Sequence, residues 1–148
     1  MIKKIDNNCE EVAKQIFTVF QSSYKVEASL IGVADFPPLL RSKIDIENSN
    51  TLFYGYFDNE ILAAIIEISI QNERLEIESL TVEPNFFRKG IAGKLISYVM
   101  TTFEFIQATV ETAVVNEPAI NLYKKHGFVE FKKFTPDHGI QKLAMSTK

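Results

Sequence analysis

The fold of this chain is decided by residues 82–95, which read VEPNFFRKGIAGKL. A run with strand character, residues 75–82, leads into this stretch, and Pro84 bends the chain after it. Apolar side chains then recur at helical spacing, which predicts an amphipathic helix over residues 88–103. These apolar positions are Ile91, Leu95, Ile96, Val99, Met100 and Phe103. The sequence therefore predicts a strand that feeds a helix through a glycine-bearing turn.

The start of that helix has the composition of an anion-binding site. The first N–H groups of a helix have no intrahelical partner, and the helix dipole adds partial positive charge there. Gly90 and Gly93 allow a ligand to approach the backbone, and Arg88 and Lys89 add two positive charges. The pattern predicts a phosphorylated ligand. The alternative is a strand–helix junction whose basic side chains are simply solvated.

Length and composition place the chain in a broad class. Its 148 residues favour a single domain over residues 1–148, and 46% hydrophobic with 24% charged residues is typical of a globular protein. A net charge of −3 argues against nucleic-acid binding. Cys9 is the only cysteine, so no internal disulfide can form, and the two histidines and one cysteine show no metal-ligand spacing.

The sequence also bears on location. Residues 1–4 are followed by acidic and polar residues rather than by the apolar core of a signal peptide. No apolar run is long enough to span a bilayer. We therefore expect a cytoplasmic protein that has no membrane partner.

Hydrophobic periodicity and turn residues divide the chain into alternating elements. In the first half we expect a strand over residues 2–5, a helix after Asp6–Asn8 running toward Ser29, a loop over residues 30–38, a short helix over residues 39–47, and strands over residues 51–57, 61–70 and 74–82. In the second half we expect the helix over residues 88–103, a strand over residues 105–115, a helix from Asn116 to His126, and a final hairpin of residues 128–134 and 140–145.

This order predicts an α/β (α+β) fold with a single mixed, mostly antiparallel sheet flanked by helices. The strands on either side of the helix at residues 88–103 form a crossover unit, so they should be parallel. The first two helices precede the main sheet and are placed to cover its open side.

Two motifs in this order resemble the GNAT superfamily of N-acetyltransferases. The first is Val82-x-Pro84 followed by Gly90-x-Ala92. The second is Asn116-x-x-Ala119-x-x-Leu122-Tyr123-x-x-x-Gly127-Phe128. Phe87 departs from the family pattern, which usually has Arg or Gln at this position, so one side-chain contact to the ligand is in question.

The resemblance implies acetyl coenzyme A as co-substrate and no metal. Its pyrophosphate is expected on the backbone amides of Arg88, Lys89, Gly90, Ile91, Ala92 and Gly93. Its pantetheine arm is expected to pair with Leu80, Thr81 and Val82 as an added strand would. For this to happen the two central parallel strands must splay apart.

The resemblance also implies catalytic roles. Tyr123 would protonate the departing thiolate, since a phenol is a proton donor at neutral pH; the alternative is an aromatic side chain packed under the sheet. Asn116 would contact the cofactor, and it is also a good helix N-cap.

A base is needed to take a proton from the amine. Glu78 and Glu111 are the candidates, acting directly or through water, and burial would raise the pKa of either; the alternative for each is a solvated strand carboxylate. Glu76 is a weaker candidate. Tyr24, Glu27 and residues 36–38 are placed to line the acceptor pocket.

We therefore expect an acetyl-coenzyme-A-dependent N-acetyltransferase in which a primary amine attacks the thioester directly within a ternary complex. The amine belongs to a small molecule or a peptide, and the sequence does not say which. The alternatives are a peptide or protein N-terminal or lysine acetyltransferase and a non-catalytic coenzyme A-binding module. A nucleotide-binding protein is disfavoured because the glycine pattern matches no nucleotide fingerprint. A homodimer is left open.

Overall fold

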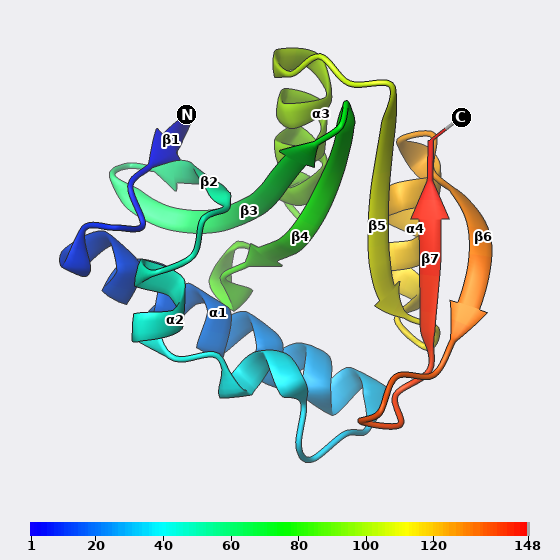
Figure 1. Cartoon of the computed structure of the whole chain (residues 1–148). Helices are drawn as coiled ribbons and strands as arrows, with labels where there is room; N and C mark the ends of the chain where they lie inside the picture. The colour runs from blue at the N-terminus through cyan, green and yellow to red at the C-terminus, as the bar shows by residue number, and fades with distance from the viewer. Residues whose placement is uncertain (148) are drawn as a thin grey trace.

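A computed structural model describes residues 1–147 and contains one seven-stranded sheet in the order β1-β2-β3-β4-β5-β7-β6 (Figure 1). Only β4 and β5 are parallel neighbours among the described residues; the other neighbouring strands are antiparallel. The strands are β1 (Ile2–Ile5), β2 (Leu52–Asp58), β3 (Ile61–Gln71), β4 (Arg74–Val82), β5 (Gln107–Ala113), β6 (Val129–Phe134) and β7 (Lys142–Ser146). The helices are α1 (Glu10–Ile31), α2 (Lys43–Glu47), α3 (Ile91–Thr102) and α4 (Glu117–Lys125), with 3₁₀ turns η1 (Pro37–Leu40) and η2 (Pro84–Phe86). The predicted mixed sheet with a central parallel pair is confirmed.

Two predicted helix boundaries are wrong. The helix expected over residues 39–47 is split into η1 and α2, because Ser42 and Asp45 form a capping box that starts a new helix. The helix expected from Arg88 begins only at Ile91. Arg88 and Gly90 have φ of 64° and 74°, in the left-handed region, so the chain is not α-helical before that point.

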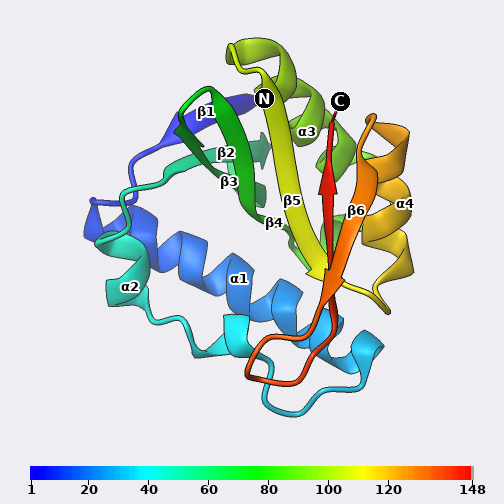
Figure 2. The ribbon, with the colours of Figure 1, turned by 45° about the vertical axis from the view of Figure 1, so that its right-hand side comes forward.

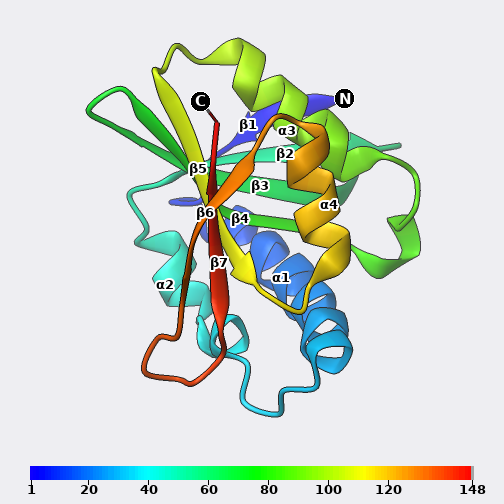
Figure 3. The ribbon, with the colours of Figure 1, turned by 90° about the vertical axis from the view of Figure 1, so that its right-hand side faces the viewer.

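Helices cover both faces of the sheet (Figures 2 and 3). One buried cluster packs α3 and α4 against the sheet; its members include Leu95 and Ile96 of α3 and Ile66 and Ile68 of β3. A second cluster packs α1 and α2 against the opposite face, with Phe20 of α1 against Phe53 of β2. The amphipathic patterns of the sequence therefore bury their apolar stripes on opposite sides of one sheet.

The parallel pair of β4 and β5 holds together over only part of its length. Register runs from Arg74 opposite Gln107 to Ile77 opposite Val110, and the strands then diverge (Figure 1). At this point β4 is also irregular against β3, since Glu67 pairs with Ser79 and Ile68 with Ile77, which leaves Glu78 as an extra residue. A bulge bends the strand that contains it. The predicted splay is confirmed, and the bulge accounts for its position.

Candidate functional site

A cleft of about 480 Å³ lies where β4 and β5 diverge. Its walls come from the second halves of both strands, from α1, from the η1 segment, from the first turns of α4, and from the β6–β7 connection. The lining residues that bear on function are Tyr24, Glu27, Phe36, Pro37, Pro38, Arg41, Glu78, Ser79, Leu80, Val82, Ala92, Glu111, Asn116, Tyr123, His138 and Lys142. Segments far apart in the sequence thus meet at the one place where the sheet is open.

The start of α3 is built as an open helix terminus. Its N-cap is Gly90, and none of the side chains in residues 1–147 caps it. The Lys94 N–H donates to Gly90 O at 3.2 Å, so the amides of Ile91, Ala92 and Gly93 come before the first intrahelical hydrogen bond. A Cβ at Gly90 would meet nothing within 4 Å, which leaves this terminus sterically open. The geometry suits an anion.

Most of the predicted anion-site residues lie beside the cleft rather than in it. Ala92 lines the cleft, whereas Arg88, Lys89, Gly90, Ile91 and Gly93 are not among its lining residues. The Lys89 ammonium lies 5.3 Å from the ring centroid of Phe86, outside the cleft lining. Phe87, which replaces the usual polar residue, is 40% exposed.

The end of β4 presents its backbone and two apolar side chains. Leu80 and Val82 line the cleft, and both pack in part against the α3 core. Thr81 alternates to the other face, where it is buried and its hydroxyl finds no hydrogen-bond partner within residues 1–147. Beyond Ile77 this strand has no register with β5, so its edge there is available to another extended chain.

Asn116 and Tyr123 occupy the two ends of α4. The Asn116 side chain accepts a hydrogen bond from the Ala119 N–H at 3.3 Å, which confirms the predicted N-cap. Tyr123 is 5% exposed and lines the cleft. Its ring packs edge-on against the ring of Phe128, with 5.6 Å between the two centroids. Burial, together with the nearby Glu27 carboxylate, raises the pKa of the Tyr123 phenol, so the hydroxyl keeps its proton.

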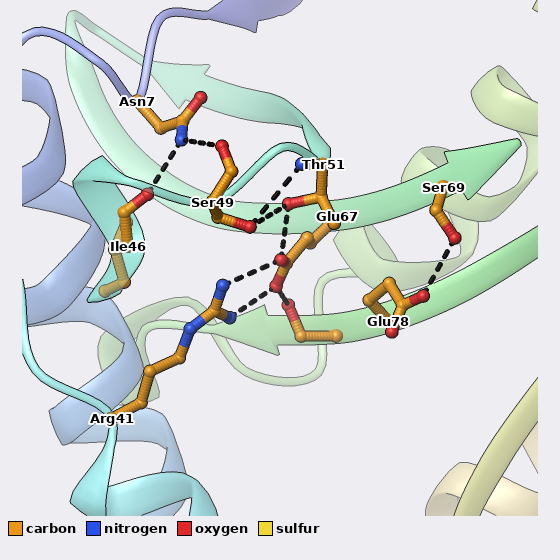
Figure 4. A network of polar contacts seen from close by, with 9 residues as sticks. Asn7, Arg41, Ile46, Ser49, Thr51, Glu67, Ser69 and Glu78 are labelled. Carbon is orange, nitrogen blue, oxygen red and sulfur yellow. Dashed lines mark hydrogen bonds and ion pairs between the residues drawn. The ribbon is translucent and has the colours of Figure 1, made fainter.

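The two predicted bases are exposed, so the burial that would favour proton uptake is not observed. The Glu78 carboxylate accepts a hydrogen bond from Ser69 Oγ at 2.8 Å (Figure 4). Glu111 pairs with Lys142 at 3.4 Å. Beside them, partial burial raises the pKa of Glu76, and the charges of Glu78 and Glu111 add to that effect.

Glu27 is half-buried in the wall of the cleft. Burial raises its pKa, while the Asn116 side chain and the Lys142 charge act in the opposite direction. Tyr24, Glu27 and residues 36–38 line this cleft, and their place in the acceptor pocket stays a prediction. Burial and the charges of Glu27 and Glu67 raise the pKa of Tyr24 as well.

A buried polar network beneath the cleft escaped sequence reasoning (Figure 4). Glu67, 2% exposed, accepts two hydrogen bonds from Arg41 at 2.7 and 2.9 Å, one from Thr51 at 2.6 Å and one from Ser79 at 2.8 Å. Burial favours protonation, but these hydrogen bonds and the Arg41 charge prevail and lower the Glu67 pKa. A carboxylate inside the apolar run Ala63–Ile70 was the available signal. No comparable signal in the sequence pointed to His138, which also lines the cleft.

Two further features of the described residues are plain. Within residues 1–147, no helix has the length and apolar character needed to cross a membrane. In the same residues, no group of three His, Cys, Asp or Glu side chains is arranged to hold a metal ion.

Comparison with known sequences gives a family and two relatives. The model of the acetyltransferase (GNAT) family matches residues 13–128. The chain is 33% identical over 129 residues to the UPF0157 protein YqkA of Bacillus subtilis, covering 86% of this chain and 38% of that protein. It is 27% identical over 120 residues to a streptothricin acetyltransferase of Escherichia coli, covering 79% of this chain and 69% of that protein. The chain therefore spans well under half of the length of YqkA.

Solved structures share the fold. The ribosomal-protein-S18-alanine N-acetyltransferase of Escherichia coli superposes with a TM-score of 0.78 at 16% identity, covering 99% of this chain and 92% of that one. The PaiA N-acetyltransferase of Thermoplasma acidophilum, solved with coenzyme A, superposes with a TM-score of 0.78 at 21% identity. The match covers 100% of this chain and 98% of that one.

Proposed function

Because the chain belongs to the acetyltransferase (GNAT) family, we propose that it transfers an acetyl group from acetyl coenzyme A to a primary amine. The amine attacks the thioester directly, and no acyl-enzyme forms. The observation that supports this most is the buried Tyr123 side chain lining a cleft that opens between two splayed parallel strands.

The residues present fit acetyl coenzyme A. The uncapped start of α3 offers backbone amides from Arg88 to Gly93 to a pyrophosphate, and Arg88 and Lys89 add positive charge close by. The unpaired edge of β4 at Leu80, Thr81 and Val82 offers hydrogen bonds to the amides of a pantetheine arm. Asn116, the buried N-cap of α4, is proposed to contact the same ligand. When bound, acetyl coenzyme A supplies an acetyl group activated as a thioester.

Tyr123 then acts as the general acid. Its raised pKa keeps the phenol protonated over the whole physiological range, so it can donate to the sulfur as negative charge develops there. Phe128 packs against the ring and fixes its orientation. The packing role and the catalytic role of this tyrosine are therefore compatible.

The proton of the attacking amine leaves through a carboxylate of the cleft. Glu78 and Glu111 are proposed for this step, directly or through water, because both line the cleft and both are accessible. The Glu111 carboxylate is already paired with the Lys142 ammonium. Glu78 has only the neutral Ser69 hydroxyl as partner, which makes it the more available of the two.

A panel of amines tested with acetyl coenzyme A and a free-thiol readout decides between the candidate functions. The panel contains peptides with free N-termini, polyamines and aminoglycosides. We expect amine-dependent thiol release that is lost in Tyr123→Phe. If calorimetry shows coenzyme A binding while no amine stimulates thiol release, the domain is a binding module and not a transferase.

A further inference from the structure

The cleft is lined by more carboxylates than cationic side chains. Three carboxylates, Glu27, Glu78 and Glu111, face two cations, Arg41 and Lys142. Both cations already have partners. Arg41 forms a bidentate pair with the buried Glu67, and Lys142 lies 3.4 Å from Glu111.

Two carboxylates remain without a cationic partner. Glu78 accepts only from the neutral Ser69 hydroxyl, and Glu27 makes no ion pair within residues 1–147, although the Lys142 charge reaches it. The histidine of the lining, His138, accepts a hydrogen bond from the Ile140 N–H at 3.1 Å. After internal pairing, the cleft therefore presents net negative charge from α1 on one side and from the bulge of β4 on the other.

A second, independent feature indicates that a ligand belongs between these carboxylates. Tyr123 is more than nine-tenths buried and lines the cleft, yet no group within residues 1–147 hydrogen-bonds to its hydroxyl. The Glu27 carboxylate lies close enough to affect that phenol. Glu27 and Tyr123 therefore line the same cleft from different helices, α1 and α4.

The wall of the cleft formed by α1 and the η1 segment is largely apolar and aromatic. Tyr24 and Phe36 pack edge to face with their ring centroids 5.9 Å apart, and Pro37 and Pro38 continue this wall. Such a wall accommodates methylene groups, and aromatic faces also attract ammonium groups. It offers little to a strongly hydrated or anionic substrate.

We propose that the acceptor is an aliphatic amine carrying a second positive charge, with Glu78, the proposed base, receiving the reacting amine and Glu27, on the α1 side of the cleft, receiving the second charge. This rests on the proposed acetyl transfer and narrows its substrate class. A peptide whose only positive charge is the reacting amine would leave Glu27 without a cationic partner.

The test compares amines that differ only in the second charge. α,ω-Diaminoalkanes from diaminopropane to diaminooctane are each paired with the monoamine of the same carbon chain. We expect at least one diamine to exceed its monoamine by about tenfold in kcat/KM, the scale of a hydrogen-bonded contact to a charged group. The preference should shrink as salt is added, since screening weakens the ionic contact.

Substitutions then locate the recognition. Glu27→Gln should lower the diamine-to-monoamine ratio toward one, whereas Glu27→Asp should keep part of the preference. Glu78→Gln should slow the acetylation of diamines and monoamines alike. The matched control is Glu11→Gln, which removes an exposed carboxylate from α1 outside the cleft and should leave the ratio unchanged.

The outcome that overturns the proposal differs from failure of acetyl transfer. Thiol release that is equal for diamines and monoamines rules out the second-charge site while acetyl transfer stands. If no amine is acetylated, calorimetry with the same amine pairs in the presence of coenzyme A decides, and equal affinities would again rule out the site.

Discussion

The first and second halves of the β4–β5 pair make opposite use of the same two strands. From Arg74 to Ile77 the strands form a parallel ladder, and Leu75, Ile77, Ala108 and Val110 are buried in the α3 core. From Glu78 onward the ladder is gone, and Glu78, Ser79, Leu80 and Val82 line a cleft. The buried half contributes stability, while the open half exposes backbone and carboxylates.

The comparison of the two halves shows which contacts hold β4 in place where it no longer pairs with β5. On the β3 side of the open half, Ser79 joins Thr51 and Arg41 on the buried carboxylate of Glu67. This network ties β4 to β2, to β3 and to the segment before α2 (Figure 4). Hydrogen bonds of the network therefore hold the bulged strand in place where its ladder with β5 has ended.

The largest expected effect comes from two leucines of β4, one in each half. Leu75→Ala, in the paired half, should lower the free energy of unfolding by about 4 kcal/mol, because it opens a cavity in a closed core. Leu80→Ala, in the open half, should cost less than half of that but weaken acetyl coenzyme A binding. Denaturant unfolding and calorimetry measure both quantities. If Leu75→Ala and Leu80→Ala lowered the free energy of unfolding equally, the two halves would not differ in their contribution to stability.

Breaking the network should have the next largest effect. Glu67→Gln should destabilise the fold by about 3 kcal/mol, since it leaves Arg41 without its charge partner. As a control, Glu10→Gln breaks the exposed pair with Lys43 and should cost about 0.5 kcal/mol or less.

The Glu67 effect should also depend on pH in a defined direction. The pKa of Glu67 is lowered from its ordinary 4.5, so its contribution is fully present above that value and is lost as pH falls through the folded pKa. The stability gap between the parent and Glu67→Gln should therefore narrow below pH 4.5. A gap that stays constant into acid would contradict this account.

In the open half, Tyr123→Phe removes a proton donor and little volume. We expect kcat to fall by about 10²-fold, while the Kd of acetyl coenzyme A hardly changes. Steady-state kinetics and calorimetry report the two values. An acyl donor with a more acidic thiol needs less protonation and should lose less in the variant; an equal loss with both donors would count against the general-acid role.

Gly90→Asp tests the helix start beside the open half. The left-handed φ of 74° strains any other residue, and the added carboxylate opposes an anion, so we expect coenzyme A affinity to fall by about tenfold. Gly32→Asp imposes the same strain at the end of α1, also at φ 74° with open space around it. This control should bind coenzyme A as the parent does. If Gly90→Asp also binds coenzyme A with the affinity of the parent, the phosphate site lies elsewhere.

The smallest effects are expected from the side chains that flank this helix start. If backbone amides hold the anion, Phe87→Arg and Arg88→Ala should each change coenzyme A affinity by about threefold or less, as for solvent-exposed charges. Affinity is measured on variants with unchanged circular dichroism. Loss of binding in Arg88→Ala would show that a side-chain charge dominates.

Local sequence signals determined much of this protein. The apolar spacing from Ile91 to Phe103, the N-cap Asn116 and the left-handed Gly127 identify helices and their ends, because these preferences act within a few residues. The two motifs place the expected cofactor and the tyrosine on those elements. The order of elements was enough to predict the parallel pair.

Only the tertiary structure decided which charges the cleft retains. Glu78 and Glu111 look alike in sequence, yet Lys142 pairs with one and Ser69 with the other. Glu67 and Arg41 lie 26 positions apart and meet only because the segment before α2 folds back onto the sheet. Glu27 of α1 and Asn116 at the start of α4 lie 89 positions apart in the sequence and line the same cleft. A carboxylate's pKa and partners depend on contacts distant in sequence, and those contacts exist only once the chain has closed around the split sheet.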